Sequence, residues 1–158
     1  MTETARPRND PPSSWHAAFP TPSACLANSS LASIAADALR DLILAQPRLD
    51  QRDFLVVDVR RTDFENAFVA GAVNLPAHSF YPTLPTLLQS SRGSSPYRRV
   101  IFHCQSSNGR GPRCAGWYQD ALNDAGIKQD VSESMVLEGG IKAWVESFGM
   151  DKELTVQL

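Results

Sequence analysis

The stretch VIFHCQSSNGRGPR, residues 100–113, constrains the fold and the chemistry of this chain more than any other. Residues 100–102 form an apolar run typical of a buried strand, and residues 114–122 favour a helix. Between them, small polar residues and glycine replace the bulky ones. The pattern predicts a strand, a tight loop and a helix, with Cys104 at the start of the loop and Arg110 at its end.

This loop favours the binding of a tetrahedral oxyanion. In a short loop that opens a helix, backbone N–H groups converge on one point, and the helix dipole adds positive potential. Such surroundings favour a thiolate, so we expect Cys104 to be a nucleophile. The planar guanidinium of Arg110 can donate two parallel hydrogen bonds to the oxyanion. The residues expected to line the oxyanion site are Gln105, Ser106, Ser107, Asn108 and Gly109.

Three stretches carry a resemblance to a known family. The motif His-Cys-x5-Arg-Gly-Pro-Arg at residues 103–113 resembles the active-site loop of the M-phase inducer phosphatases, which are dual-specificity cysteine phosphatases with a rhodanese fold. It also resembles the loop of small fungal arsenate reductases. Residues 58–76 and 137–144 carry further rhodanese-type motifs. The resemblance implies an α/β fold of three layers, with a central parallel sheet of about five strands flanked by helices.

The alternation of apolar runs and amphipathic segments predicts the same architecture. Strands that alternate with helices form parallel sheets through right-handed crossovers, and ligands bind outside the carboxyl ends of such strands. Cys104 lies at one of these ends. Ser33 is expected to cap a helix that runs to Leu44. The expected strands cover residues 54–57, 72–75, 100–102 and 134–137.

Several residues near the loop have two interpretations. Asp58 and Arg60 are expected to form an ion pair that fixes the loop after their strand, and a catalytic acid is the alternative. His103 is expected to order the loop by hydrogen bonding. Arg113 either attracts a second anionic group at the mouth of the site or is simply solvated. Cys114 is expected to pack in the core, with a redox role as the alternative.

The length of the loop separates the possible reactions. Sulfurtransferases that resemble this chain elsewhere typically place four residues between the cysteine and the basic residue, which suits a persulfide. This chain has five, Gln105 to Gly109, and the larger loop matches phosphate or arsenate. We therefore rank oxyanion chemistry above transfer of sulfur from thiosulfate.

The sequence places a phosphatase first and an arsenate reductase second. A phosphatase would act on a phosphorylated protein through a phosphocysteine intermediate, and Arg-Gly-Pro-Arg matches the phosphatases. Its leaving group benefits from a general acid, but Gln105 and Gly109 stand where the M-phase inducers carry glutamates. Arsenate expels water or hydroxide, and glutathione with glutaredoxin would complete its reduction. A noncatalytic phosphate-binding module is the least expected interpretation.

The chain is expected to contain one catalytic domain between two terminal segments. One catalytic domain is expected at residues 30–148, after a disordered proline-rich tail at residues 1–24 and before a C-terminal extension at residues 149–158. Trp15 and Phe19 are exceptions within the tail that could dock on the domain or on a second copy.

Composition argues against several classes of partner. The net charge of −2 gives no reason to expect nucleic acid, and no apolar stretch suits a membrane span or a signal peptide. Three cysteines without metal-ligand spacing, of which Cys25 lies at the tail boundary, indicate neither a disulfide framework nor a metal or other cofactor. The cytoplasm or the nucleus is the expected location, and the oligomeric state is open.

Overall fold

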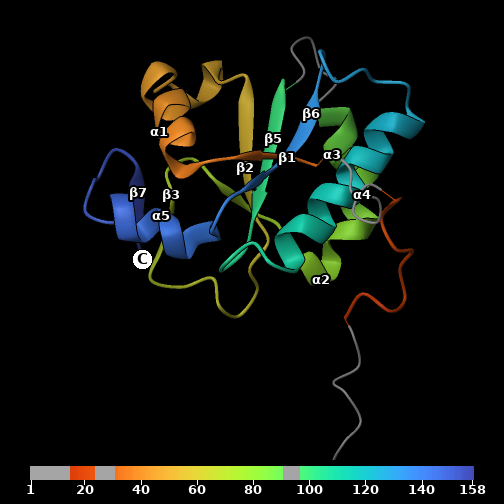
Figure 1. Ribbon diagram of the computed structural model, residues 1–158, viewed down its shortest axis with the longest axis horizontal. Coiled ribbons are helices and arrows are strands. Elements are labelled where there is room, and N and C mark those ends of the chain that lie inside the picture. The colour runs from red at the N-terminus through yellow and green to blue at the C-terminus, as the bar shows by residue number, and fades with distance from the viewer. Residues whose placement is uncertain (1–14, 24–30, 91–96) are drawn as a thin grey trace, which may run out of the picture.

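Five parallel strands form the central sheet of this protein (Figure 1). The computed structural model describes residues 15–23, 31–90 and 97–158. In spatial order the strands are β1, β6, β5, β2 and β4. The predicted α/β fold with a parallel sheet of about five strands is confirmed. The bounds of these strands are β1 (Ala32–Ile34), β2 (Phe54–Asp58), β4 (Val73–Asn74), β5 (Arg99–His103) and β6 (Glu133–Leu137).

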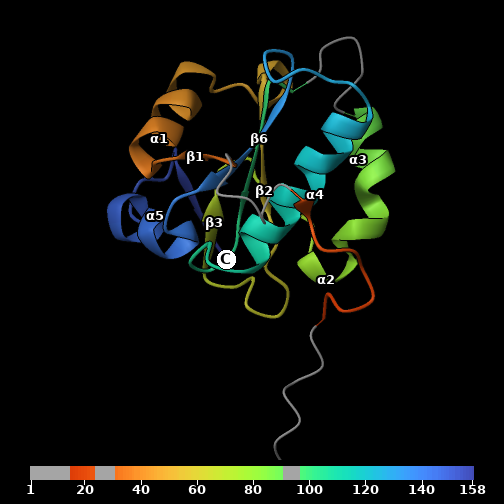
Figure 2. The ribbon, with the colours of Figure 1, turned by 45° about the vertical axis from the view of Figure 1, so that its right-hand side comes forward.

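Helices cover both faces of the sheet (Figures 1 and 2). One face carries α1 (Ala36–Ala45) and α5 (Gly140–Phe148), and the other carries α2 (Ala77–Phe80), α3 (Leu84–Ser90) and α4 (Arg110–Asp124). Two short 3-10 helices, η2 (Leu49–Gln51) and η3 (Tyr81–Thr83), complete the helical elements of the described residues.

The three central residues of strand β5 are apolar because they contribute to two hydrophobic cores. Val100 and Phe102 pack in the core on the α4 side, whereas Ile101 packs in the core under α1 and α5. Successive side chains of a strand point to opposite faces of the sheet, so a strand covered on both sides needs an uninterrupted apolar run. Burial on both faces of the sheet therefore explains the continuous apolar pattern that predicted this strand.

The prediction that Ser33 caps a helix was wrong. Ser33 lies in the edge strand β1 opposite Val136 of β6, and its hydroxyl donates a hydrogen bond to Glu138 (3.0 Å). Helix α1 begins later, and Ala35 occupies its N-cap position without a side-chain cap. A three-residue edge strand exists only because β6 pairs with it, and no local pattern reveals that partner.

The C-terminal residues form a second, two-stranded sheet. Strand β7 (Thr155–Gln157), within the stretch expected to be an extension, pairs antiparallel with β3 (Ala67–Val69). The indole N–H of Trp144 donates to the hydroxyl of Thr155 (3.0 Å), and both side chains are buried. The chain end therefore fastens α5 to the rest of the domain.

Part of the expected N-terminal tail lies against the domain. Trp15 and Phe19 contact the ring of Trp117 on α4, with centroid separations of 5.8 and 5.9 Å. The indole N–H of Trp117 donates to the carbonyl of Pro20 (2.8 Å). These two aromatic residues dock on the domain itself, as the sequence allowed. Residues 1–14 of the tail and Cys25 lie outside the described residues.

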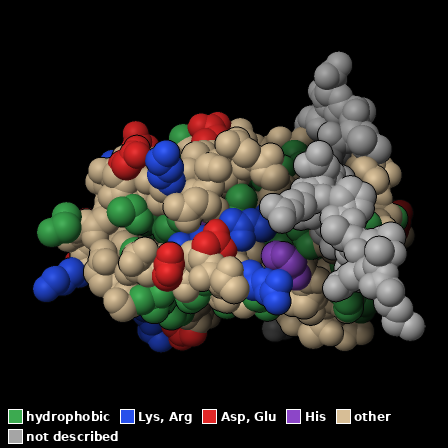
Figure 3. All heavy atoms as spheres, turned by 90° about the horizontal axis from the view of Figure 1, so that it is seen from below, with side chains coloured by type: hydrophobic (Ala, Val, Ile, Leu, Met, Phe, Trp, Pro, Cys, Tyr) green, Lys and Arg blue, Asp and Glu red, His purple; other side chains and the backbone are tan. Residues whose placement is uncertain are grey.

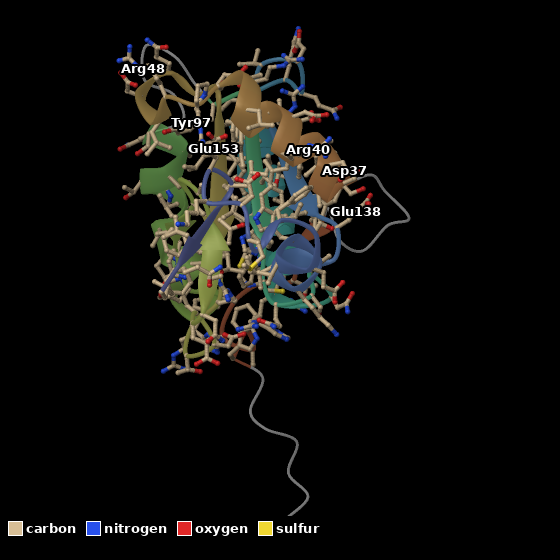
Figure 4. All side chains as sticks on the ribbon, turned by 90° about the vertical axis from the view of Figure 1, so that its left-hand side faces the viewer. Asp37, Arg40, Arg48, Tyr97, Glu138 and Glu153 are labelled. Carbon is tan, nitrogen blue, oxygen red and sulfur yellow. The ribbon has the colours of Figure 1, made fainter. Side chains whose placement is uncertain are left out.

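The outward surface of α1 is charged, as Figure 4 shows. Arg40 lies 3.8 Å from the carboxylate of Asp37 and 2.9 Å from that of Asp41. Such exposed pairs contribute little to stability. In the described part of the chain, no helix has the length and apolarity to cross a membrane.

Candidate active site

The loop between β5 and α4 lies at the carboxyl edge of the sheet, as the sequence predicted. In Figure 1 this is the lower edge, next to α2. Figure 3 shows the molecule from below: acidic and basic side chains lie next to one another near the centre, with a histidine beside them. Cys104 is 4% exposed, and Arg110 is the first residue of α4. The site is therefore shallowly buried and rich in charge.

The first amides of α5 hold the carbonyl groups of the loop. Ile141 N–H donates to the carbonyl of Cys104 (3.1 Å), and Lys142 N–H donates to that of Gln105 (3.0 Å). In a planar trans peptide the N–H points opposite to the C=O. The N–H groups of Gln105 and Ser106 therefore point away from α5, an orientation that suits donors to a bound anion.

His103 supports the same carbonyl from inside the protein. Its Nδ1 lies 3.1 Å from the carbonyl oxygen of Cys104, and because a carbonyl can only accept, Nδ1 must carry the proton. The ring is fully buried, and desolvation lowers its pKa despite the opposing effect of Asp58. His103 is therefore neutral at physiological pH and acts on the backbone of the loop.

Close approach of α5 to the loop requires glycine at position 140. Gly140 has a φ of +60°, and a Cβ added there would lie 2.6 Å from the carbonyl oxygens of both Cys104 and Gln105. Ser107, within the loop, also has a positive φ of 58°, which is uncommon for a residue with a side chain. The turn of the loop thus places Ser107 at a positive φ, and the approach of α5 places Gly140 at one.

The thiol of Cys104 faces the N-terminus of α4. The N–H of Gly111 donates to Sγ over 3.3 Å, and a Cβ on Gly111 would come within 3.3 Å of the Cys104 backbone nitrogen. The N-terminal end of a helix favours negative charge. The hydrogen bond and the helix N-terminus therefore both direct positive potential toward the sulfur. Cys114, about one turn further along α4, is fully buried in the core.

Arg110 forms an ion pair that sequence analysis missed. Its Nη1 and Nη2 donate to the two carboxylate oxygens of Asp63, at 2.7 and 2.5 Å. These hydrogen bonds hold the pKa of Asp63 down to about 2, and Asp63 in turn raises the pKa of Arg110. One signal pointed to Asp63: it follows β2, which pairs with β5, and neighbouring parallel strands end at the same edge.

Asp58 and Arg60 form a buried ion pair beneath that segment. Arg60 donates to Asp58 at 2.7–3.0 Å, and the two residues are 2% and 0% exposed. The same guanidinium donates to the carbonyls of Asp63 (3.2 Å) and Ala67 (2.8 Å). The pair therefore fixes the backbone of residues 63–67. Neither side chain lines the cavity beside Cys104.

A cavity of about 490 Å³ opens beside Cys104. Most of the residues that the sequence predicted for the oxyanion site line this cavity, but Ser107 does not. The N-terminal segment also contributes to the lining, and no sequence pattern placed it there. The lining from the loop and helix is Cys104, Gln105, Ser106, Asn108, Gly109, Arg110, Pro112 and Arg113, and the lining from the N-terminal segment is Trp15, His16, Thr21 and Pro22.

The arrangement suits an anionic reactant. Two arginines, a thiol and loop amides surround the cavity, and its described lining carries no acidic side chain. Among residues 15–23, 31–90 and 97–158, no group of three His, Cys, Asp or Glu side chains is placed to hold a metal ion. The chemistry that this lining can supply is nucleophilic attack by sulfur and stabilisation of negative charge.

Comparison with known proteins agrees with this geometry. The family model described as the rhodanese-like domain matches residues 37–147. Arsenate reductase 2.2 of Oryza sativa subsp. japonica is 38% identical over 99 residues, which cover 62% of this chain and 74% of that protein. Dual specificity phosphatase ibp1 of Schizosaccharomyces pombe is 25% identical over 135 residues, which cover 77% and 93%.

A solved structure shows the same fold. The structure of a yeast protein tyrosine phosphatase of the rhodanese family superimposes with a TM-score of 0.66 at 23% identity. The match covers 81% of this chain and 93% of that one. At this level of identity the likeness is one of fold.

Proposed function

The chain belongs to the rhodanese-like domain family, and from this premise we propose that it is an arsenate reductase. Its relatives include arsenate reductases and dual-specificity phosphatases, so it is an enzyme of the rhodanese superfamily with one of these two activities. The sequence alone placed the phosphatase first. The order changes because identity to the arsenate reductase is 38%, against 25% to the phosphatase.

The single observation that carries the proposal is the lack of an acidic side chain in the described lining of the cavity. The alkoxide leaving group of an alkyl phosphate ester benefits from a proton donor, typically by 10²–10⁴-fold. Asp63, at the edge of the site, is held ionised by Arg110 and donates no proton in this pairing. Arsenate loses water or hydroxide instead, which reduces the need for an acid.

The proposed reaction begins with attack of the Cys104 thiolate on arsenic. An S–As bond forms, and an oxygen of arsenate leaves as water or hydroxide. Arg110 and the loop amides stabilise the charge on the remaining oxygens. Reduction of arsenate to arsenite takes two electrons. Two thiols of the reductant, glutathione with glutaredoxin, supply them as they become a disulfide. Water then cleaves the S–As bond, which releases arsenite and restores the thiol of Cys104.

A protein phosphatase is the second candidate, and the size of the cavity favours it. About 490 Å³ falls within the roughly 300–1,000 Å³ typical of sites for small organic ligands. Such a space would accept the organic part of a phosphate ester as well as the reductant thiol. Cys104 would then attack phosphorus, and water would hydrolyse the phosphocysteine.

The test is a side-by-side assay of the purified protein. The substrates are arsenate with glutathione and glutaredoxin, an aryl phosphate, and thiosulfate with cyanide. We expect arsenite to form faster than the aryl phosphate is hydrolysed at matched concentrations, with no thiocyanate. Faster dephosphorylation would make the phosphatase the better assignment. Thiocyanate as the main product would overturn the argument from loop length.

A further inference from the structure

The ion pair between Asp63 and Arg110 uses only one end of the guanidinium. Nη1 and Nη2 each donate once, to separate oxygens of Asp63, at 2.7 and 2.5 Å. An arginine side chain has five N–H donors in a fixed plane. The pairing therefore leaves the edge made by Nε–H and the adjacent Nη proton, which is the other edge able to hold an oxyanion by two parallel bonds.

The guanidinium also lies beside the nucleophile. Hydrogen bonding to Asp63 and, more weakly, interaction with the side chain of Cys104 raise the pKa of Arg110. Arg110 and Cys104 line the same cavity, whereas Asp63 does not line it. Arg110 thus stands between a carboxylate outside the cavity and the sulfur inside it.

Asp63 is itself held in place. The N–H of Arg61 donates to one of its carboxylate oxygens (3.1 Å), and Arg60 donates to its backbone carbonyl (3.2 Å). Arg60 is anchored by the fully buried carboxylate of Asp58. A continuous series of contacts therefore runs from the buried pair beneath the sheet edge, through the loop after β2, to Arg110.

From these contacts we propose that Asp63 is a positioning residue, which holds the end of the Arg110 guanidinium so that its side edge faces an oxyanion over Cys104. The inference rests on the proposed function only in requiring that Arg110 binds the oxyanion, and it applies equally to arsenate and phosphate. Ordering a long arginine side chain costs conformational entropy. With Asp63 present, this cost is met on folding and not during each substrate encounter.

Positioning of Arg110 by Asp63 should affect the rate of the reaction more than the affinity for the oxyanion. Asp63 orients Arg110, which favours the transition state, but its negative charge also repels a bound anion. Removing the carboxylate relieves the repulsion while it frees the guanidinium. We therefore expect the variant Asp63→Asn to lose turnover while its affinity for an oxyanion changes little.

The first experiment compares Asp63→Asn with Glu65→Gln. Glu65 is an exposed carboxylate two residues along the same loop, and it makes no contact with Arg110 among the described residues. We expect Asp63→Asn to lower kcat about 10- to 100-fold. The inhibition constant of inorganic phosphate should stay within about threefold, and Glu65→Gln should behave as wild type. Wild-type kcat in Asp63→Asn, at unchanged melting temperature, would overturn the proposal.

A double-mutant cycle tests whether Asp63 acts through Arg110. Introduced into Arg110→Lys, which lacks the planar fork, Asp63→Asn should cost no more than about a further twofold in kcat. If the kcat loss of the double variant equals the product of the losses of the two single variants, the proposal is overturned. If Arg110→Lys alone keeps the wild-type rate, Arg110 does not bind the oxyanion as the proposed function requires. If Arg110→Lys is impaired and Asp63→Asn is not, only the present inference fails.

The pH profile distinguishes positioning from proton donation. Asp63 faces Arg110 and Arg61, and His78 on α2 is electrostatically coupled to the same three charges. A positioning carboxylate stays ionised throughout, so Asp63→Asn should lower the plateau of kcat without moving either limb of the profile. Loss of the basic limb in Asp63→Asn would identify a general acid and would overturn the proposal.

Discussion

Two buried cysteines of this protein differ in what surrounds the sulfur. Cys104 accepts a hydrogen bond from the N–H of Gly111 at the start of α4, and it lines the cavity. Cys114 is fully buried in the core between the sheet and the helices on the α4 side. A thiol needs access to substrate and stabilisation of its charge in order to act as a nucleophile. Only Cys104 has both.

We expect Cys104→Ser to reduce arsenite formation by at least about 10³-fold, because removal of a nucleophile costs roughly this much or more. Cys114→Ser serves as the matched control and should keep turnover within a few-fold, although a hydroxyl in an apolar site lowers stability. Comparable loss of turnover in both folded variants would give Cys114 a part in the reaction.

The buried His103 should make the free energy of unfolding depend on pH. Burial lowers its pKa below the value of about 6.5 expected in the unfolded chain. Below pH 6.5 the unfolded chain therefore binds a proton that the folded protein resists. The free energy of unfolding should fall with decreasing pH from about 6.5 to the folded pKa, by up to ~1.4 kcal/mol per pH unit.

Urea unfolding at pH 7.5, 6.5 and 5.5 measures this dependence. A folded His103→Asn variant should be less stable at pH 7.5 but should show a shallower decline. The same slope in both proteins would mean that other groups, and not His103, govern stability in this range.

At the scale of elements, the N-terminus of α5 supports the backbone of the loop. Its amides donate to the carbonyls of Cys104 and Gln105, and Gly140 permits the approach. Gly126, just beyond the end of α4, has a similar φ of +70°, but an added Cβ there would meet nothing within 4 Å. A substitution at Gly126 would therefore introduce backbone strain alone, whereas one at Gly140 would also disturb the site.

We expect both Gly140→Ala and Gly126→Ala to lose stability, about 1 kcal/mol for Gly126→Ala from strain in the left-handed region. Only Gly140→Ala should also lose turnover, because its Cβ would push against the loop. Thermal melts and kcat measured on the same samples would test this. Equal turnover in the two variants would show that contact with α5 is not needed for the shape of the loop.

At the scale of the whole molecule, a segment from the start of the chain completes the cavity. Trp15 lines the cavity and contacts Trp117, whereas Phe19 contacts Trp117 and Tyr81 without lining the cavity. Trp15 and Cys104 line the same cavity although they are 89 residues apart in the sequence. The segment therefore limits what can reach the sulfur.

We expect Trp15→Ala and Phe19→Ala each to lower the free energy of unfolding by about 1–2 kcal/mol, since both side chains are half-buried. Trp15→Ala alone should raise KM for an aryl phosphate, while KM for arsenate, a much smaller substrate, should hardly change. Parallel changes in KM for both substrates would instead mean that Trp15 shapes the oxyanion loop itself.

Features of this protein that depend on neighbouring residues can be predicted from the amino-acid sequence. The apolar run before Cys104, the small loop and the helix after it are consecutive, so their pattern predicts the strand, the loop and the nucleophile. The alternation of such units predicts a parallel sheet, and this in turn places Cys104 at its carboxyl edge.

The distant groups that meet at this edge are brought together by the folded chain. Strand β1 exists because β6 pairs with it, Asp63 reaches Arg110 across 47 residues, and Trp15 closes the cavity from the far end of the chain. A three-residue strand has little local signature, and the position of a carboxylate after a strand does not reveal which cation it will pair with. In both cases the partner is supplied only by folding. Periodicity encodes which face of an element is buried, whereas pairing depends on which other elements contact that face in the folded chain.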